Sequence, residues 1–359
     1  MMHTIRHTLP EILDLGPNAT SAKSDTIPYP PETRNHSYHG GVGMGRPIEM
    51  KSSFLRAAGR FAAIAGIITA FTSLASPQTP KAPAPPQKCL MWKAVSGTNV
   101  VYLLGSIHLG SKKMYPLPKP IEDAYSRSKV LVVEVDITKV DTAEAMSFVS
   151  EKGMYQGGDT LWKHLSPETT GKVKAFGAKY GMDDSVLGML KPWLVSVELE
   201  VLPMQKAGMD LKLGIDKYFL DRASSPKTPK TVVQLETADF QLKLLSSLPE
   251  NLSDEYLSYS LGESSNSLEE DSKLEKLWIA GDAKALNDAM PKYPEHLVSL
   301  MRSIREDRNP HMADVAEKYL KGGGPCFFVV GAAHLVGSEG VIALLQQRGY
   351  TVFQVSSNP

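Results

Sequence analysis

The stretch Val100–Gly110, VVYLLGSIHLG, contains an apolar run of strand type that ends in a glycine, and His108 follows that glycine by three residues. Cys326–Ser338, CFFVVGAAHLVGS, repeats the pattern near the other end of the chain, with His334 again three residues after a glycine. Short apolar runs of this kind are consistent with strands in the interior of a sheet. We therefore predict that both copies are buried strands and that their histidines contribute to one site.

Further strands alternate with helical patterns along the chain. Val130–Val133 and Thr231–Leu235 are β-branched runs of strand length. Such alternation predicts an α/β fold with a central, mostly parallel sheet. Two long helical stretches, at about 137–225 and 238–321, interrupt it. We expect them to form a large helical cap on a single domain that spans residues 89–359.

The composition places the chain among ordinary globular proteins and disfavours one class of partner. Of its 359 residues, 42% are hydrophobic and 22% are charged, which is typical of a folded protein. The 39 basic and 39 acidic residues cancel, so no overall positive field attracts nucleic acid. We therefore expect no nucleic-acid partner.

The N-terminal part differs in composition from the rest. Residues 1–49 are polar and rich in Pro, Gly, Asn and His. They cannot bury enough apolar surface to fold alone, and we expect them to be disordered. A different pattern begins at Met50, and our hypothesis is that Met50 is the true start. Residues 76–88, SPQTPKAPAPPQK, predict an extended Pro-rich linker.

Residues 50–75 have the layout of a secretory signal peptide. Three basic residues precede an uncharged, mostly apolar run at 61–74, and Ser73–Ala75 supplies a small-x-small cleavage signal. The alternative is an uncleaved anchor that associates with the membrane through residues 57–75, although a span needs about 20 apolar residues. Either interpretation predicts export to the periplasm or the extracellular space.

Export bears on the two cysteines, Cys89 and Cys326. In an oxidising compartment an even number of cysteines favours a disulfide. Each cysteine stands shortly before one of the two Gly-x-x-His strands, so we expect a Cys89–Cys326 bridge. The alternative is a pair of buried free thiols.

Polar side chains follow four of the predicted strands. His108, Glu134, Glu236 and His334 lie at or just beyond the ends of these strands. If the strands are parallel, the four side chains gather at one edge, where α/β sheets bind ligands. Two imidazoles and two carboxylates can bind a divalent metal ion and supply a general base for a bound water. Each residue alone has a structural alternative, such as helix capping by Glu236.

The motifs, taken in order, resemble those of the TraB/GumN family, which includes the Tiki metalloproteases and the pheromone-shutdown proteins. The matching elements are Tyr102–Gly110, Pro116–Pro118, Val132–Asp136, Lys191–Trp193, Gly214–Asp216, Leu235–Thr237, Arg308–Asn309 and Val330–Gly337. The resemblance implies a fold similar to the erythromycin-esterase and ChaN-like proteins. Asp307 precedes Arg308 where the family pattern has Glu.

The same resemblance implies site residues and a cofactor. His108, Glu134 and His334 would form the catalytic centre and bind a divalent ion, manganese or cobalt by resemblance and zinc as an alternative. Glu236 and Arg308 would support that centre. The leading hypothesis is an exported metal-dependent hydrolase that cleaves peptide bonds. The alternatives are a metal-independent ester or lactone hydrolase with a histidine base, and a non-catalytic protein that sequesters a peptide or a haem-like ligand.

Overall fold

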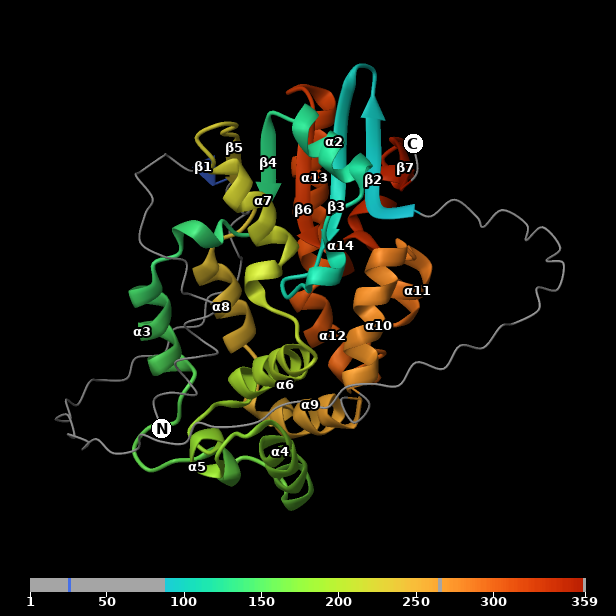
Figure 1. Cartoon of the computed structure of the whole chain (residues 1–359). Coiled ribbons are helices and arrows are strands. Elements are labelled where there is room, and N and C mark those ends of the chain that lie inside the picture. Colours follow the sequence, from blue (N-terminus) through green and yellow to red (C-terminus); the bar gives the residue numbers. More distant parts are fainter. Residues whose placement is uncertain (1–24, 27–87, 264–266, 358–359) are drawn as a thin grey trace, which may run out of the picture. The chain divides into compact units, whose positions relative to one another are not determined.

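The structure is a computed structural model, and it describes residues 25–26, 88–263 and 267–357 (Figure 1). The predicted signal segment 50–75 lies outside the described residues, as do nearly all of the predicted disordered segment 1–49 and the linker 76–88. All described residues belong to one compact unit. No helix among these residues has both the length and the hydropathy that a membrane span requires.

The described strands form one sheet in the order β1-β5-β4-β6-β3-β2-β7. Their bounds are β1 (Asp25–Thr26), β2 (Lys88–Ser96), β3 (Asn99–Ser106), β4 (Val130–Val133), β5 (Thr231–Gln234), β6 (Cys326–Gly331) and β7 (Thr351–Ser356). The five strands β1, β5, β4, β6 and β3 are parallel to one another. The strand β2 pairs antiparallel with both β3 and β7. The prediction of a mostly parallel α/β sheet is therefore confirmed.

The two Gly-x-x-His strands are neighbours in this sheet. β3 and β6 pair from Val101 with Cys326 to Ser106 with Gly331, and β4 flanks β6 on its other side. The buried runs of these strands are nearly continuous, as expected for parallel strands that are covered on both faces. The register brings the carboxyl ends of the central strands to one edge.

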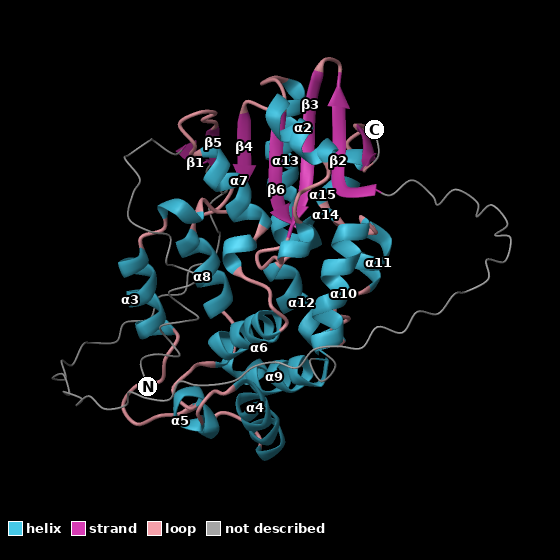
Figure 2. Ribbon diagram, in the orientation of Figure 1, coloured by secondary structure: helices cyan, strands magenta, loops and turns pink. Residues whose placement is uncertain are grey.

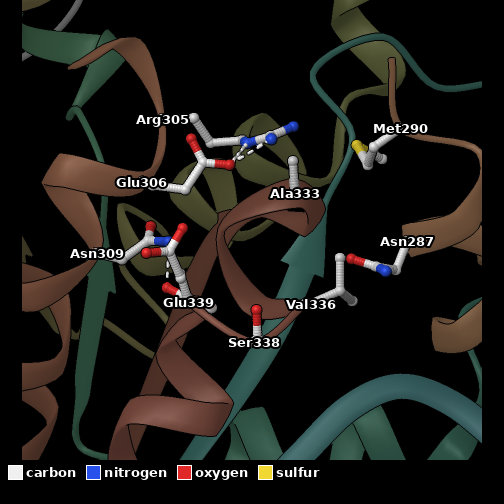
Figure 3. A pocket seen from close by; sticks show the side chains of 11 residues that line it. Asn287, Met290, Arg305, Glu306, Asn309, Ala333, Val336, Ser338 and Glu339 are labelled. Atoms are coloured by element: carbon white, nitrogen blue, oxygen red, sulfur yellow. Dashed lines mark hydrogen bonds and ion pairs between the residues drawn. The ribbon is translucent and has the colours of Figure 1, made fainter. Parts of the chain in front are cut away.

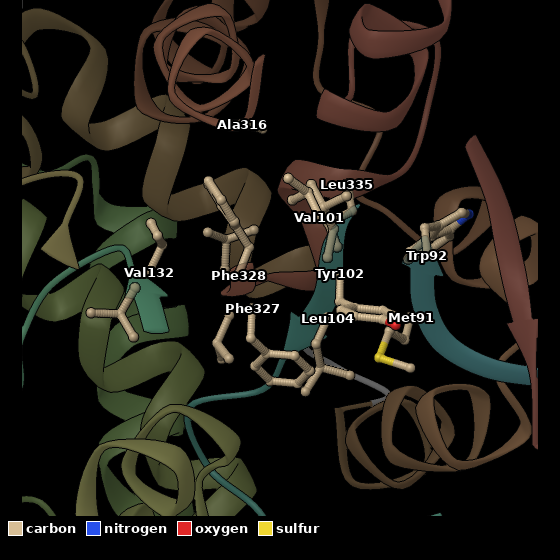
Figure 4. Close-up of a cluster of buried hydrophobic side chains, with 14 of the residues drawn as sticks. Met91, Trp92, Val101, Tyr102, Leu104, Val132, Ala316, Phe327, Phe328 and Leu335 are labelled. Carbon is tan, nitrogen blue, oxygen red and sulfur yellow. The ribbon is translucent and has the colours of Figure 1, made fainter. Parts of the chain in front are cut away.

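Helices cover both faces of the sheet, and neighbouring phenylalanines of β6 show why. Phe327 packs against Tyr125 of α2 (Lys119–Arg127) and Phe219 of α7 (Ile215–Ala223). The next residue, Phe328, points to the opposite face and meets Tyr319 of α13 (Asn309–Lys321). Figure 4 shows both rings within the apolar core between these layers.

Further helices lie beyond the carboxyl ends of the parallel strands (Figure 2). They are α3 (Thr142–Lys152), α4 (Pro167–Tyr180), α5 (Asp184–Leu187), α6 (Pro192–Lys206), α8 (Ala238–Ser246), α9 (Glu250–Glu263), α10 (Ser267–Ala280), α11 (Ala283–Asp288) and α12 (Glu295–Ile304). Several of them share a second apolar core around Leu161, Leu187, Val195 and Leu257. The expected helical cap is therefore present, and it stands at the edge of the sheet where the polar residues were predicted to gather.

The expected disulfide is absent, because Cys89 and Cys326 are both buried free thiols. The expectation rested on the nearness of the strands and did not take into account where along them each cysteine lies. Since β2 runs antiparallel to β3, Cys89 lies near the end of β3, beyond the pair formed by Met91 and Leu104. Cys326 pairs with Val101, near the start of β3. At about 3.3 Å per residue the two α-carbons are farther apart than the roughly 7 Å that a disulfide spans.

Candidate active site

Four of the five predicted site residues, Glu134, Glu236, Arg308 and His334, form one buried cluster at the carboxyl edge of the sheet. Glu134 directly follows β4, and Glu236 lies two residues beyond β5. The amide of Glu236 donates to the carbonyl of Glu134 at 2.8 Å, so the β4–β5 ladder continues to these residues. Both carboxylates are buried. Continuation of this pairing beyond β4 and β5 therefore brings the two acidic residues close together.

Arg308 bridges this pair of carboxylates. It lies in a short 3-10 helix (Glu306–Arg308) before α13, and it donates from Nε and Nη2 to Glu236 at 2.8 and 2.6 Å. Nη2 also donates to Oε2 of Glu134 at 3.0 Å. Gln241 of α8 donates to Glu236 at 3.0 Å and to Glu134 at 3.3 Å. Such bidentate pairing compensates for burial of the charges.

The electrostatics of Glu134 reflect these neighbours. Burial would raise the pKa of its carboxyl group, but His334, Arg308 and His108 lower that pKa to about 2. The amide of Gly331 also donates to Oε1 of Glu134. A β-carbon at position 331 would stand 3.1 Å from this oxygen, so the glycine allows the backbone to approach the carboxylate closely.

His334 lies on α14 (Ala332–Leu335), a single helical turn that directly follows β6. Its Nδ1 is 2.7 Å from Oδ1 of Asn309. Because the Asn309 amide nitrogen donates to the carbonyl of Glu339, its oxygen accepts from Nδ1–H of His334. Nε2 of His334 is then the unprotonated nitrogen, 3.8 Å from Oε1 of Glu134. Burial lowers the pKa of this imidazole.

His108 is the most solvent-accessible of the predicted site residues, with 63% of its side chain exposed. Its Nδ1 is 2.8 Å from Oδ2 of the buried Asp216, and the charge of Asp216 raises the pKa of His108 to about 9. A β-carbon at Gly214 would stand 2.1 Å from the carbonyl oxygen of His108. The Gly214–Asp216 motif therefore lets the start of α7 contact the histidine loop directly.

Three contributing residues were not predicted as site residues. Asp216 and Asn309 stood inside recognised motifs, and their position next to histidine partners in space had no sequence signal. Gln241 follows Glu236 by about one helical turn and had no motif of its own. Each depends on how a helix docks on the sheet edge.

The candidate metal ligands are not assembled as a complete set. Among the side chains that the structure describes, no three His, Cys, Asp or Glu groups are arranged to hold a metal ion. Arg308 donates hydrogen bonds to both Glu134 and Glu236, and Nδ1 of His108 is bound to Asp216. The residues nearest to such a set are His334 and Glu134.

A small polar cavity of about 170 Å³ adjoins the support of His334. Asn309 and Ala333 line it, together with Arg305 and Glu306, which form an ion pair at its rim (Figure 3). Asn309 thus lies between this cavity and the imidazole. The cavity is therefore separate from the side of His334 that faces Glu134.

This geometry defines an α/β protein with a polar, charge-compensated site at the carboxyl edge of its sheet. The chain belongs to the TraB/PrgY/gumN family, whose sequence profile matches residues 90–354. The family resemblance seen in the motifs is therefore confirmed.

Two relatives are uncharacterized proteins named YbaP, from Escherichia coli (strain K12) and Shigella flexneri. Each is 28% identical over 163 residues, which cover 44% of this chain and 58% of the relative. The match thus spans somewhat more than half the length of these relatives. No solved structure matches the chain significantly.

Proposed function

We propose that this protein is an exported metal-dependent hydrolase that cleaves peptide bonds. One observation carries the proposal: each site histidine has its Nδ1 held by an oxygen, His108 by Asp216 at 2.8 Å and His334 by Asn309 at 2.7 Å. Proteins orient metal-binding imidazoles in this way, because the second hydrogen bond fixes the ring and leaves Nε2 available.

The donor chemistry at this edge suits a divalent ion. His108, His334 and Glu134 would hold it, and imidazole and carboxylate are accepted by manganese, cobalt and zinc. When bound, such an ion polarises a carbonyl group and lowers the pKa of a water molecule. Glu134 is the better ligand of the two glutamates, because its Oε1 lies 3.8 Å from Nε2 of His334.

The remaining residues hold this centre in place. Arg308 has five N–H donors, and its hydrogen bonds to Glu236, Glu134 and the carbonyl of Ile304 use Nε, Nη1 and Nη2. Its role is therefore to fix the two carboxylates, and less to stabilise an oxyanion. Glu236 is fully buried and bound to Arg308 and Gln241, so it supports Glu134 and is a poor candidate for proton abstraction.

Peptide cleavage and export rest on other grounds. The peptide substrate is supported by the resemblance to Tiki-type metalloproteases, and export by the signal-like segment at residues 50–75. N-terminal sequencing of the mature protein from the native host tests export. A mature chain that retains residues 1–49 would contradict it.

A metal-free ester or lactone hydrolase is the second candidate, and the His108–Asp216 pair favours it. An exposed imidazole oriented by a buried carboxylate is the arrangement of a general base in hydrolases. In this mechanism Nε2 of His108 takes the proton from water or a hydroxyl group, and because Asp216 raises the pKa of His108 to about 9, the rate should increase as the pH rises towards 9. Glu134, Glu236 and Arg308 would then serve to shape the site.

A peptide-library digest read by mass spectrometry separates these possibilities. The purified protein is stripped with chelator and then reloaded with Mn²⁺, Co²⁺ or Zn²⁺. We expect metal-dependent cleavage that His108→Ala and His334→Ala abolish. His296→Ala is the matched control, because His296 pairs with Glu255 on an exposed part of the cap.

Other outcomes reject the proposal. Hydrolysis of esters that survives chelation and requires Asp216 would establish the metal-free mechanism. Identical peptides from wild type and His108→Ala under every condition would leave a binding protein that sequesters a peptide or a haem-like ligand.

A further inference from the structure

We propose that helix α10 positions His108 by binding both ends of the loop that carries it, through Trp278 and Glu275. The loop, Gly105–Ser111, is called the histidine loop below. The catalytic consequence rests on the proposed function, whereas the positioning itself does not.

Trp278 holds the first end of the histidine loop. Its indole Nε1 donates to the carbonyl of Gly105 at 2.6 Å, and Trp278 is buried. A buried carbonyl that loses its partner costs more free energy than an average hydrogen bond contributes. The indole therefore fixes the point where β3 passes into the loop.

Glu275 holds the second end. The hydroxyl of Ser111 donates to Oε1 of Glu275, and both side chains are buried. The same hydroxyl accepts from the amide of Lys113 at 3.1 Å, so its orientation is determined from two sides. Glu275 has no cationic partner among the described side chains, which makes Ser111 its principal stabilising contact.

Both contacts come from one face of one helix. Residues three apart on a helix are neighbours on its surface, and Glu275 and Trp278 have this spacing. They bind the two ends of a segment whose fourth residue is His108. On its other side the loop meets Asp210, which exchanges two backbone hydrogen bonds with Gly110. The histidine is thus held between α10 and the segment that leads to Asp216.

The C-terminal end of α10, about one turn beyond Trp278, is bound to the sheet. The carbonyl of Gly281 accepts from Nε2 of Gln354 on β7 at 2.7 Å, and the same amide group donates to the carbonyl of Cys89 on β2. A β-carbon at Gly281 would stand 2.1 Å from the carbonyl oxygen of Lys88. Because α10 is fixed to two strands, it can serve as a rigid support for the loop.

Two kinds of variant test this role. Trp278→Phe keeps the ring and removes the donor, and Glu275→Leu removes the acceptor. Glu275→Gln keeps an oxygen that can accept from Ser111, and the histidine loop should stay ordered in this variant. Lys276→Ala changes an exposed residue of the same helix and is the matched control.

Amide hydrogen exchange of the histidine loop is the primary readout, because it needs no substrate. We expect exchange of the amides at 106–111 to become at least about tenfold faster in Trp278→Phe and Glu275→Leu. Exchange should stay within about twofold of wild type in Glu275→Gln and Lys276→Ala, and exchange of the β4 and β6 amides should not change in any folded variant.

Kinetics supply the second readout. If the proposed hydrolase activity is found, kcat should fall about tenfold in the two disruptive variants, since misplacement of a reacting group acts on the chemical step, while KM changes less than about twofold. Absence of hydrolase activity in the wild-type protein would reject the proposed function, and the hydrogen-exchange test of the positioning role would still hold. Unchanged exchange in both disruptive variants would overturn the positioning role, and if Trp278→Phe fails to fold, the Glu275 pair decides.

Discussion

Arg308 binds Glu236 through two parallel hydrogen bonds, from Nε to Oε1 at 2.8 Å and from Nη2 to Oε2 at 2.6 Å. The same Nη2 reaches Glu134, so one guanidinium group compensates two buried carboxylates. Continuation of the β4–β5 ladder to residues 134 and 236 brings two acidic side chains together in the interior, and a cation between them offsets both their repulsion and the cost of burying their charge.

Replacement of Arg308 by methionine should therefore destabilise the protein strongly. We expect a loss of about 3–5 kcal/mol in the free energy of unfolding at pH 7, the cost of leaving buried charges without a partner. Denaturant unfolding measures it. Arg302→Met removes an exposed ion pair with Glu339 and should cost less than about 1 kcal/mol. Equal losses in the two variants would contradict this role of Arg308.

The pH dependence of that loss has a definite sign. The pKa of Glu134 is lowered to about 2, so its contribution to stability is present above the ordinary value of 4.5 and is lost as the pH falls towards 2. The difference between wild type and Arg308→Met should shrink below about pH 4.5. A difference that stays constant from pH 3 to pH 8 would show that the guanidinium acts through packing alone.

Asp216→Asn should lower the pKa of His108 from about 9 towards its ordinary 6.5, because the charge of Asp216 is the largest cause of the rise. An NMR titration of the imidazole measures the change. The stabilising effect of the pair is present below about pH 6.5 and is lost as the pH rises through 9. Asp159→Asn is the matched control, since Asp159 pairs with His164 in the same way at 2.8 Å. A pKa of His108 that does not move in Asp216→Asn would refute this account.

Asn309→Leu should weaken divalent-metal binding by roughly 10- to 100-fold, the usual effect of removing the partner that orients a ligand imidazole. Asn309→Asp keeps an acceptor for Nδ1 of His334 and should be milder. Competition with a fluorescent chelator measures the affinity. Asn287→Ala, on the opposite wall of the small cavity, controls for changes in that cavity. Unaltered affinity in Asn309→Leu would remove His334 from the ligand set.

Both cysteines should remain reduced. Their thiols are buried, which raises the pKa of Cys89 to about 11 and that of Cys326 still further, so the thiolate that attacks reagents is scarce. We expect negligible reaction with a thiol reagent in the native protein and two reactive thiols after denaturation without reductant. Fewer than two would mean that a bridge forms.

The sequence predicted the strands of the sheet better than it predicted the contacts between side chains. The apolar runs at Val130–Val133 and Cys326–Gly331 are local patterns that predict strands buried on both faces, which is typical of parallel sheets. The position of each cysteine along its strand in the assembled sheet was not encoded locally, and the wrong disulfide followed from that. Asp216 lies 108 residues from His108, so their hydrogen bond depends on how α7 docks, which no local pattern reports.

Glu198 of α6 offers the clearest test of stability against pH outside the candidate site. The side chain is buried, Oε2 has no hydrogen-bond partner among the described residues, and burial raises its pKa from 4.5 to about 7. Above pH 4.5 the folded protein must therefore either keep Glu198 protonated or bury its negative charge. The contribution of this group is fully favourable below about pH 4.5 and is lost as the pH rises to 7.

Glu198→Gln removes this titration while it preserves shape. The variant should match wild type near pH 4 and exceed it at pH 8 by an amount of order 3 kcal/mol, which is the free energy that corresponds to such a shift. Urea unfolding at a series of pH values gives the difference curve, which should rise between pH 4.5 and 7 and then level off, because above its folded pKa the group is ionised in both states. Glu144→Gln, at an exposed position of α3, should give a flat curve. A flat curve for Glu198→Gln as well would mean that its carboxylate finds a partner or water on ionisation, and the burial of Glu198 would then carry no penalty.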